Sequence, residues 1–362
     1  MDASERAAAA RSTAAAAREV ADTVEQVSKS IRANVGRFLP SAGPAADPMT
    51  PINMTNDLVY GAIRALTPVV GEAVARSVAA AASDDAPSVR NDPDRAAALA
   101  GLAAAFGDRL PSELTPQMGY RTPNGADPAA GLAVFVHGLG GHGGQWSDGY
   151  LQIAAQAGLN PVLVDYNTGL PIAQNAAAFA DLMTDLVAAE PAVEQIVFIA
   201  HSMGGLIVTA AIDAAPQPIP DEESTDWRSL VTDVVTLGTP HEGAPLERVS
   251  DFALRAASRW PTAAPIANLG HFRSQGIKDL ARGYAGSLPD DINHHAVVAN
   301  LGTPGSPIGG TLGDGLVPPR SAAGRSPNRT SVTVTQVFDT GHNALLDHDE
   351  VAALLARILS DG

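Results

Sequence analysis

The chain has 362 residues, of which 45% are hydrophobic and 17% are charged, against about 25% charged in an average globular protein. This composition predicts one large folded core with an extension and excludes global disorder. The formal net charge of −16 argues against partners with phosphate backbones, and the absence of cysteine excludes disulfides, thiolate metal sites and a cysteine nucleophile.

The start of the chain shows no pattern of a targeting or membrane-spanning segment. The first residues carry charges of both signs, and the alanine runs after them are broken by Arg11 and Arg18, so the apolar centre of a signal peptide does not form. No apolar run approaches the roughly 20 residues that cross a bilayer. We therefore expect a soluble protein located in the cytoplasm.

The first third of the chain is predicted to be helical. Residues 1–39 carry an amphipathic helix whose apolar residues recur at spacings of three and four, namely Val20, Val24, Val27, Ile31, Val35 and Phe38. Residues 40–130 follow as a helical region with linkers rich in proline and glycine, with helices expected at 57–66, 68–82 and 93–106. The apolar stripe either docks on the rest of the chain or binds a partner or a lipid surface.

Residues 131–362 alternate short apolar runs with helical patterns, which is typical of a parallel sheet with crossover helices. The expected strands are almost continuously apolar, as strands buried on both faces are, and cover residues 132–136, 161–164, 195–199, 234–237, 296–299 and 332–338. The predicted fold class is α/β: a mostly parallel sheet flanked by helices, with a helical N-terminal extension and a lid-like insertion.

The predicted insertion covers residues 243–288, between the fourth and fifth expected strands, and is much longer than a usual connection. Its large apolar side chains either face the candidate nucleophile described next or form a small core of their own: Phe252, Leu254, Trp260, Ile266, Leu269 and Phe272. Of these, we expect Trp260 and Phe272 to contact the substrate.

The strongest chemical signal is Ser202, in the segment Ala200-His201-Ser202-Met203-Gly204, which joins an expected strand to a helical pattern. A sharp strand-to-helix turn requires small residues two positions before and after its central residue, and Ala200 and Gly204 meet this requirement. A serine hydroxyl is a weak nucleophile at neutral pH and needs a base, which in turn needs an acid to orient it.

His342 is the best-placed base, because it follows the last expected strand and so lies at the carboxyl edge of the sheet, where open α/β folds bind ligands. Asp314 is the preferred acid, since it lies in a glycine-flanked loop after the preceding strand. The rival, Asp339, is only three residues from His342 at the end of the same strand.

Acyl transfer also needs preorganised N–H donors for an oxyanion. We predict that the backbone N–H groups of Met203 and Leu139 serve as these donors. Met203 directly follows Ser202 at a helix N-terminus, and Leu139 lies in the glycine-rich segment His137-Gly138-Leu139-Gly140-Gly141 after the first strong strand.

Together these residues resemble the lipase and esterase branch of the α/β-hydrolase superfamily, in which nucleophile, acid and histidine follow one another in this order. The resemblance covers roughly residues 132–359, and three further segments support it: Asp165-Tyr166-Asn167-Thr168-Gly169, Leu237-Gly238-Thr239-Pro240-His241-Glu242-Gly243 and Gly313-Asp314-Gly315-Leu316-Val317-Pro318. More narrowly, the chain is similar to bacterial GPI inositol-deacylase-like hydrolases, in which a helical N-terminal region precedes the same core. The first position of the serine motif is alanine here instead of the usual glycine.

The resemblance implies an α/β-hydrolase fold and a serine hydrolase that cleaves carboxylic esters with Ser202, Asp314 and His342 through an acyl-enzyme, without metal or organic cofactor. The substrate is then a small-molecule ester or a lipid, and neither nucleic acid nor a stable membrane span is expected. The alternative is a non-catalytic binding or scaffold protein that keeps the fold and associates through its N-terminal helix.

Overall fold

The structure is a computed structural model, and it describes residues 93–108, 115–123, 130–214, 226–257, 274–284, 286–305, 312–324 and 332–360. The helix expected at 93–106 is present as α3 (Pro93–Phe106). The other predicted helices of the N-terminal extension, including the apolar stripe of residues 1–39, lie outside the described residues. Trp260 and Phe272 also lie outside them.

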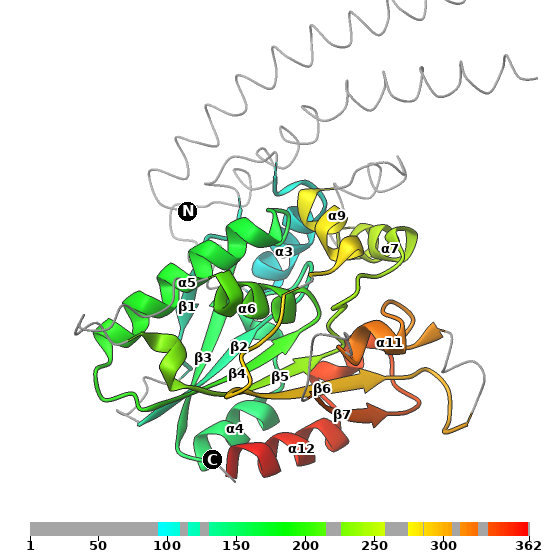
Figure 1. The fold of residues 1–362 in the computed structure, drawn as a ribbon. Helices are drawn as coiled ribbons and strands as arrows, with labels where there is room; N and C mark the ends of the chain where they lie inside the picture. The colour runs from blue at the N-terminus through cyan, green and yellow to red at the C-terminus, as the bar shows by residue number, and fades with distance from the viewer. Residues whose placement is uncertain are drawn as a thin grey trace, which may run out of the picture.

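Within the described residues, seven strands form one sheet in the order β1-β3-β2-β4-β5-β6-β7 (Figure 1). All neighbouring strands are parallel except β1 and β3, which are antiparallel. The bounds are β1 (Gly119–Arg121), β2 (Gly131–Val136), β3 (Leu159–Asp165), β4 (Gln195–His201), β5 (Val231–Leu237), β6 (Asn293–Ala299) and β7 (Val332–Val337). The predicted α/β class and its mostly parallel sheet are confirmed, and each of the six predicted strands is present.

The strand that the sequence pattern did not predict is β1. It has three residues, pairs only with β3 at the edge of the sheet, and leaves Tyr120 exposed. A strand this short and only partly buried has no apolar run by which it could be recognised.

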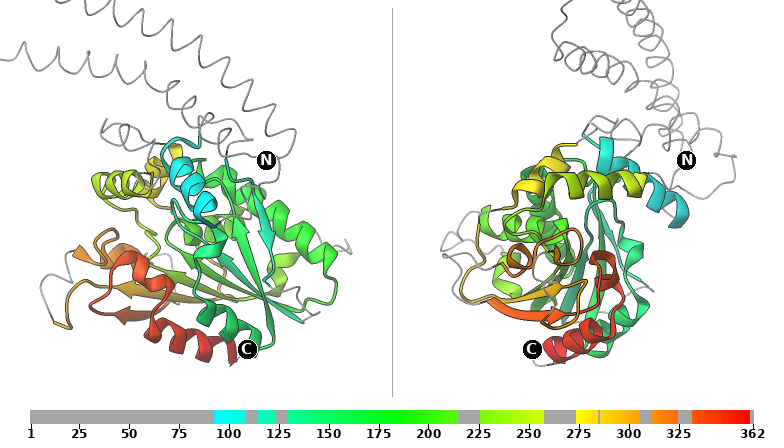
Figure 2. Two further views of the ribbon diagram at one scale, coloured as in Figure 1. Left: turned by 180° about the vertical axis from the view of Figure 1, so that it is seen from behind. Right: turned by 90° about the vertical axis from the view of Figure 1, so that its right-hand side faces the viewer.

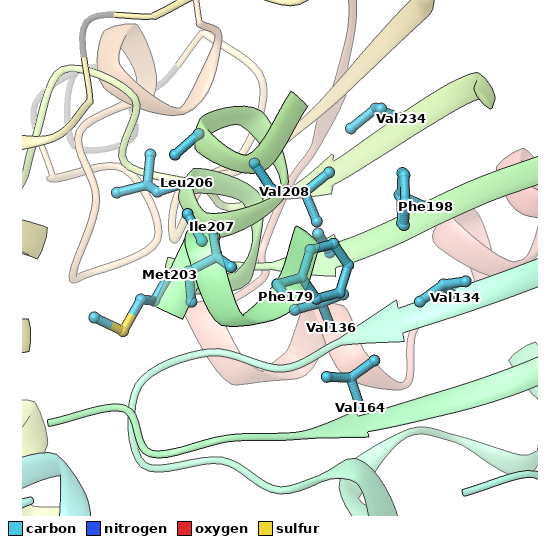
Figure 3. Packing of buried hydrophobic residues seen from close by; sticks show 14 of the residues in the cluster. Val134, Val136, Val164, Phe179, Phe198, Met203, Leu206, Ile207, Val208 and Val234 are labelled. Carbon is cyan, nitrogen blue, oxygen red and sulfur yellow. The ribbon is translucent and has the colours of Figure 1, made fainter. Parts of the chain in front are cut away.

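Helices cover both faces of the sheet (Figures 1 and 2). One face carries α5 (Ile172–Ala189) and α6 (Met203–Ala214), and the other carries α4 (Asp148–Gln156) and α12 (Asp349–Ser360). Alternate residues of the central strands therefore enter different cores: Val134 and Val136 of β2 pack under α5 and α6 (Figure 3), whereas Phe135 packs on the side of α4 and α12. This two-sided burial is why β2, β4 and β5 consist of nearly continuous apolar residues.

The described parts of the insertion contain α7 (Leu246–Ala257) and α9 (Gln275–Arg282), which lie beside α3 (Figure 1). Two hydrogen bonds join α9 to the C-terminal end of α3. Ser274 Oγ donates to the backbone oxygen of Ala104 at 2.6 Å, and Asp108 Oδ2 accepts from the backbone nitrogen of Gln275 at 3.0 Å. The described end of the N-terminal region and α9 of the insertion are thus in direct contact.

No helix in the described ranges combines the length and apolar character needed to cross a bilayer.

Candidate active site

Ser202 lies in the turn between β4 and α6, with a φ of 53° that places a non-glycine residue in the left-handed region. The turn is tied to the neighbouring strand, because Ser202 N donates to the backbone oxygen of Leu237 at 2.9 Å. Two residues later, a Cβ at Gly204 would lie 2.3 Å from the backbone oxygen of Val136, so only glycine lets α6 approach β2 this closely. The surrounding structure therefore holds Ser202 in a strained turn at the carboxyl edge of the sheet.

His342 and Asp314 meet at the same edge. His342 is the first residue of the short helix η5 (His342–Leu346) after β7, and Asp314 lies in the loop after β6. His342 Nδ1 lies 2.6 Å from Asp314 Oδ2, and both side chains are buried. A charge-assisted hydrogen bond of this length is among the strong ones in proteins.

Two backbone groups hold the Asp314 carboxylate. Its Oδ1 accepts hydrogen bonds from Leu316 N at 2.9 Å and from Val317 N at 2.7 Å. Burial alone would raise the pKa of this carboxyl, but His342 and the two N–H groups hold the pKa below its ordinary value. An ionised carboxylate can only accept, so the proton of the hydrogen bond belongs to His342 Nδ1; in a neutral imidazole this arrangement places the lone pair on Nε2.

The rival acid, Asp339, is exposed in the turn after β7 and has a φ of 51°. The contact to His342 Nδ1 is made by Asp314.

The histidine ring lies next to the serine turn. His201 Nε2, from the residue before Ser202, donates to the backbone oxygen of His342 at 3.1 Å, and the two rings are 4.7 Å apart. His342 Nε2 is buried and has no hydrogen-bond partner among the described residues, Ser202 included. Hydrogen bonds between catalytic groups are often loose before substrate binds.

A glycine at the end of β5 makes room for the acid and the histidine. A Cβ at Gly238, where φ is 59°, would lie 3.1 Å from Asp314 Oδ2 and 3.2 Å from His342 Nδ1. Any side chain at this position would press on the hydrogen bond between them.

Residues 138–141, the glycine loop, follow β2 and pass directly beside the serine. A Cβ at Gly138 would lie 2.8 Å from Ser202 Cβ. Thr168 Oγ1 accepts a hydrogen bond from Gly140 N at 3.2 Å and so fixes the middle of the loop. The backbone N–H groups of Leu139 and Met203 donate no hydrogen bond within the described part of the chain, which leaves both available to a ligand.

Two other histidines near the site are held neutral. Burial lowers the pKa of His137 to about 4 and that of His201 to about 3. His137 stacks on the Tyr166 ring at 4.3 Å, and the Tyr166 hydroxyl donates to the backbone oxygen of His137 at 2.6 Å. Both histidines therefore act as uncharged packing and hydrogen-bonding groups.

A cavity of about 530 Å³ opens beside His342. The insertion reaches it through Phe252 of α7, whose ring meets the His342 ring at nearly a right angle with 5.8 Å between ring centres. The lining residues come from the glycine loop, the segment after it, the serine turn, α7 and η5: Gly138, Leu139, Gly140, Gly141, Gln145, His201, Phe252, His342, Asn343 and Leu346.

Sequence reasoning did not single out Gln145, and it named Thr168 only as part of segment 165–169, without a role for its hydroxyl group. The only local signal for Gln145 is its position three residues after His142, a spacing that resembles a capping box, and that pattern indicates a helix start and not a cavity wall.

No cluster of three or more side chains suited to a metal ion occurs in the described ranges.

A model of the alpha/beta hydrolase family matches residues 133–354. Similar solved structures include a lipase from Bacillus licheniformis in its mature form, with 20% identity, a TM-score of 0.47 and coverage of 67% of this chain and 97% of that one. An esterase from a Rhodococcus species has 15% identity and a TM-score of 0.43, covering 67% of this chain and 94% of that one. A monoacylglycerol lipase from Paleococcus ferrophilus has 16% identity and a TM-score of 0.42, covering 68% and 99%. No curated protein matches the chain.

Proposed function

The chain belongs to the alpha/beta hydrolase family, and from this premise we propose that it is a serine hydrolase that cleaves carboxylic esters through an acyl-enzyme. The observation that carries the proposal is the 2.6 Å contact of His342 Nδ1 with Asp314 Oδ2, beside the strained turn of Ser202. When the proton is on Nδ1, His342 carries a lone pair on Nε2 that can accept the proton of the nearby serine hydroxyl. An activated serine nucleophile requires such a base.

In the proposed reaction, Ser202 Oγ adds to the ester carbonyl carbon while its proton passes to His342 Nε2. The bond to the leaving alcohol then breaks, and His342 returns the proton to the alcohol oxygen. Water adds to the acyl-enzyme in the same way, giving a proton to His342, and the carboxylic acid leaves as Ser202 regains its proton. Asp314 keeps Nδ1 protonated and stabilises the imidazolium that forms in each half of the reaction.

The N–H groups of Leu139 and Met203 are proposed to bind the oxyanion of the tetrahedral intermediates. The loop of Leu139 passes against Ser202, and both donors lack other partners within the described ranges. Donors of this kind typically contribute on the order of 10²–10³ each in kcat when they are preorganised. The hydrogen bond from Gly140 N to Thr168 Oγ1 supplies that preorganisation.

The cavity supports an ester with an apolar part. Leu139, Phe252 and Leu346 supply its apolar walls, and its volume of about 530 Å³ suits a small molecule. Trp260 and Phe272 are proposed to extend the acyl-binding wall from the insertion. The narrower resemblance to GPI inositol-deacylase-like hydrolases stays a prediction, because the matching family model is the broad one.

A fluorophosphonate probe tests the proposal directly, since only an activated serine reacts with it. We expect the full chain to be labelled and to hydrolyse p-nitrophenyl esters, and we expect the Ser202→Ala variant to do neither. A folded wild-type protein that neither takes the label nor cleaves any ester would favour the non-catalytic alternative.

A further inference from the structure

Gln145 ends the short helix η3 (Gly143–Gln145), which directly follows the glycine loop and His142. Its Oε1 accepts a hydrogen bond from His142 N at 3.3 Å, closing a capping box in which His142 Nδ1 also accepts from Gly144 N at 3.2 Å. A backbone N–H needs an acceptor, so the oxygen of the carboxamide faces His142 and the NH₂ group points elsewhere.

These hydrogen bonds set the orientation of the Gln145 carboxamide, but its NH₂ group donates no hydrogen bond within the described ranges. Within the described ranges Gln145 Nε2 has no hydrogen-bond partner, while the residue lines the cavity beside His342. The carboxamide also packs closely against Gly141, because a Cβ there would be 2.4 Å from Oε1 and 2.9 Å from Nε2. Gln145 therefore carries a donor, unpaired among the described residues, at the wall of the cavity, next to the glycine loop.

Hydrogen bonds also fix this segment relative to the histidine. Ser147 N donates to the backbone oxygen of Leu346 at 3.3 Å, and the Tyr150 hydroxyl donates to the backbone oxygen of Leu345 at 3.0 Å. Leu345 and Leu346 belong to η5, which begins with His342. The donor of Gln145 and the ring of His342 are thus carried by two segments that are bonded to each other.

We propose that Gln145 Nε2 donates a hydrogen bond to a second acceptor oxygen of the substrate, separate from the scissile carbonyl oxygen. The site then prefers esters that carry an ether, hydroxyl or carbonyl oxygen in the alcohol or acyl part over alkyl esters of the same size. This inference rests on the proposed ester hydrolysis and narrows its substrate class. A site built to hydrogen-bond a substrate atom discriminates against an analogue that lacks it, because the protein donor is then left unpaired.

The decisive variant is Gln145→Glu. A glutamate has the same shape and keeps an oxygen for His142 N, so the capping box survives, but it has no N–H to donate. The substrates are pairs that differ by one ether oxygen, which can accept a hydrogen bond but cannot donate one to the new carboxylate. Methoxyethyl hexanoate against butyl hexanoate tests the alcohol side, and ethyl methoxypropanoate against ethyl pentanoate tests the acyl side.

The measured quantity is the ratio of kcat/KM for the ether ester to that for the alkyl ester. Comparing this ratio between proteins cancels the intrinsic reactivity of each ester and any general loss of rate. In Gln145→Glu we expect it to fall about tenfold in one of the two pairs, and the pair that responds identifies the side of the substrate that carries the oxygen. An unchanged ratio in both pairs overturns the proposal.

Two further variants separate the lost donor from other effects. Asn343→Asp places the same new charge on the cavity wall while Gln145 stays intact, so its ratio should equal that of the wild type. A fall as large as that of Gln145→Glu would assign the effect to charge and overturn the proposal. Gly141→Ala pushes the carboxamide out of position and should lower the ratio with the glutamine still present.

The failure of this inference differs from the failure of the proposed function. If the wild type cleaves the esters, Ser202→Ala does not, and the ratios are unchanged, only the role of Gln145 is wrong. If the wild type cleaves none of the esters, both proposals fall.

Discussion

Gly276 of α9 lies against the backbone oxygen of Thr168, so closely that a Cβ on residue 276 would be 2.1 Å from that oxygen. The same Cβ would lie 3.1 Å from Cε of Met203, the residue after Ser202. Thr168 in turn accepts the hydrogen bond of Gly140 N in the glycine loop. The insertion therefore contacts Met203, a proposed oxyanion donor, and Thr168, which holds the loop of the other donor. The position of α9 is thus coupled to the geometry of the proposed oxyanion site.

Gly276→Ala tests this coupling. The added methyl group meets backbone and cannot be absorbed by a side-chain rotation, so we expect unfolding free energy to fall by about 1–3 kcal/mol and kcat to fall with it. Chemical denaturation and ester kinetics measure the two effects. Gly149→Ala in α4 is the matched control, since its Cβ would meet only Ser147 Oγ at 3.3 Å; equal losses in both variants would argue against a specific contact at residue 276.

Replacing the proposed nucleophile separates catalysis from stability. Ser202→Ala and Ser202→Gly should both lower kcat by a factor on the order of 10⁶, as loss of an activated serine does in other hydrolases. The left-handed backbone of residue 202 favours glycine, so Ser202→Gly should be more stable than Ser202→Ala by about 1 kcal/mol. Denaturant melts compare the two variants, and residual activity in pure Ser202→Ala would remove the mechanism.

The two aspartates near His342 should differ sharply in their effect. Asp314→Asn should lower kcat on the order of 10⁴, because a carboxamide can donate to Nδ1 and so favours the wrong tautomer of His342. Asp339→Asn should have little effect, since Asp339 is exposed and Asp314 makes the contact. Steady-state kinetics on one chromogenic ester measures both effects. A larger loss of kcat in Asp339→Asn than in Asp314→Asn would mean that Asp339 is the acid.

Stability should fall as the pH is lowered from about 6.5 to about 4, because His137 has a folded-state pKa of about 4 against an ordinary value of 6.5. In that window the unfolded chain binds a proton that buried His137 does not, so protonation favours unfolding. The lowered pKa of Asp314 contributes only below about 3.9, where stability from that carboxylate is lost as the unfolded state takes up a proton first.

His137→Phe removes this titration and keeps an aromatic ring against Tyr166. Its unfolding free energy, measured by urea denaturation at several pH values, should depend less on pH between 6.5 and 4 than that of the wild type. If the unfolding free energies of the two proteins depend equally on pH, His137 takes up its proton in the folded state over the same pH range as in the unfolded state, and the prediction is wrong.

The walls of the acyl pocket can be tested with esters of graded chain length. Trimming Phe252, Trp260 or Phe272 to alanine should change the relative kcat/KM of short and long acyl esters, by up to about 10–200-fold where a close fit is lost. Fluorophosphonate labelling should persist in all three, because the reactive serine is on another element. An unchanged profile in every variant would leave the insertion as a structural subdomain and place the pocket in the core loops.

Local pattern was enough to predict the central sheet and the turn at Ser202. The central strands β2, β4 and β5 are buried on both faces, and burial of that kind demands runs of apolar residues that can be read from the sequence. The small residues at positions 200 and 204 are likewise a local requirement, since the turn brings them against β2 and its neighbours. In both cases the physical constraint acts on residues that are adjacent along the chain.

Contacts between distant segments were decided only by tertiary structure. The sequence pairs His342 with Asp314, 28 positions earlier, but it does not give the 2.6 Å contact of Nδ1 with that carboxylate or the place of the ring beside His201, because loop lengths and strand order determine those distances. The same holds for edge strand β1, for the docking of α3 on α9 and for the carboxamide of Gln145 at the cavity wall. These features depend on which surfaces come into contact after the sheet has formed. A single polar residue or a half-buried strand has no periodic sequence pattern from which such a contact could be predicted.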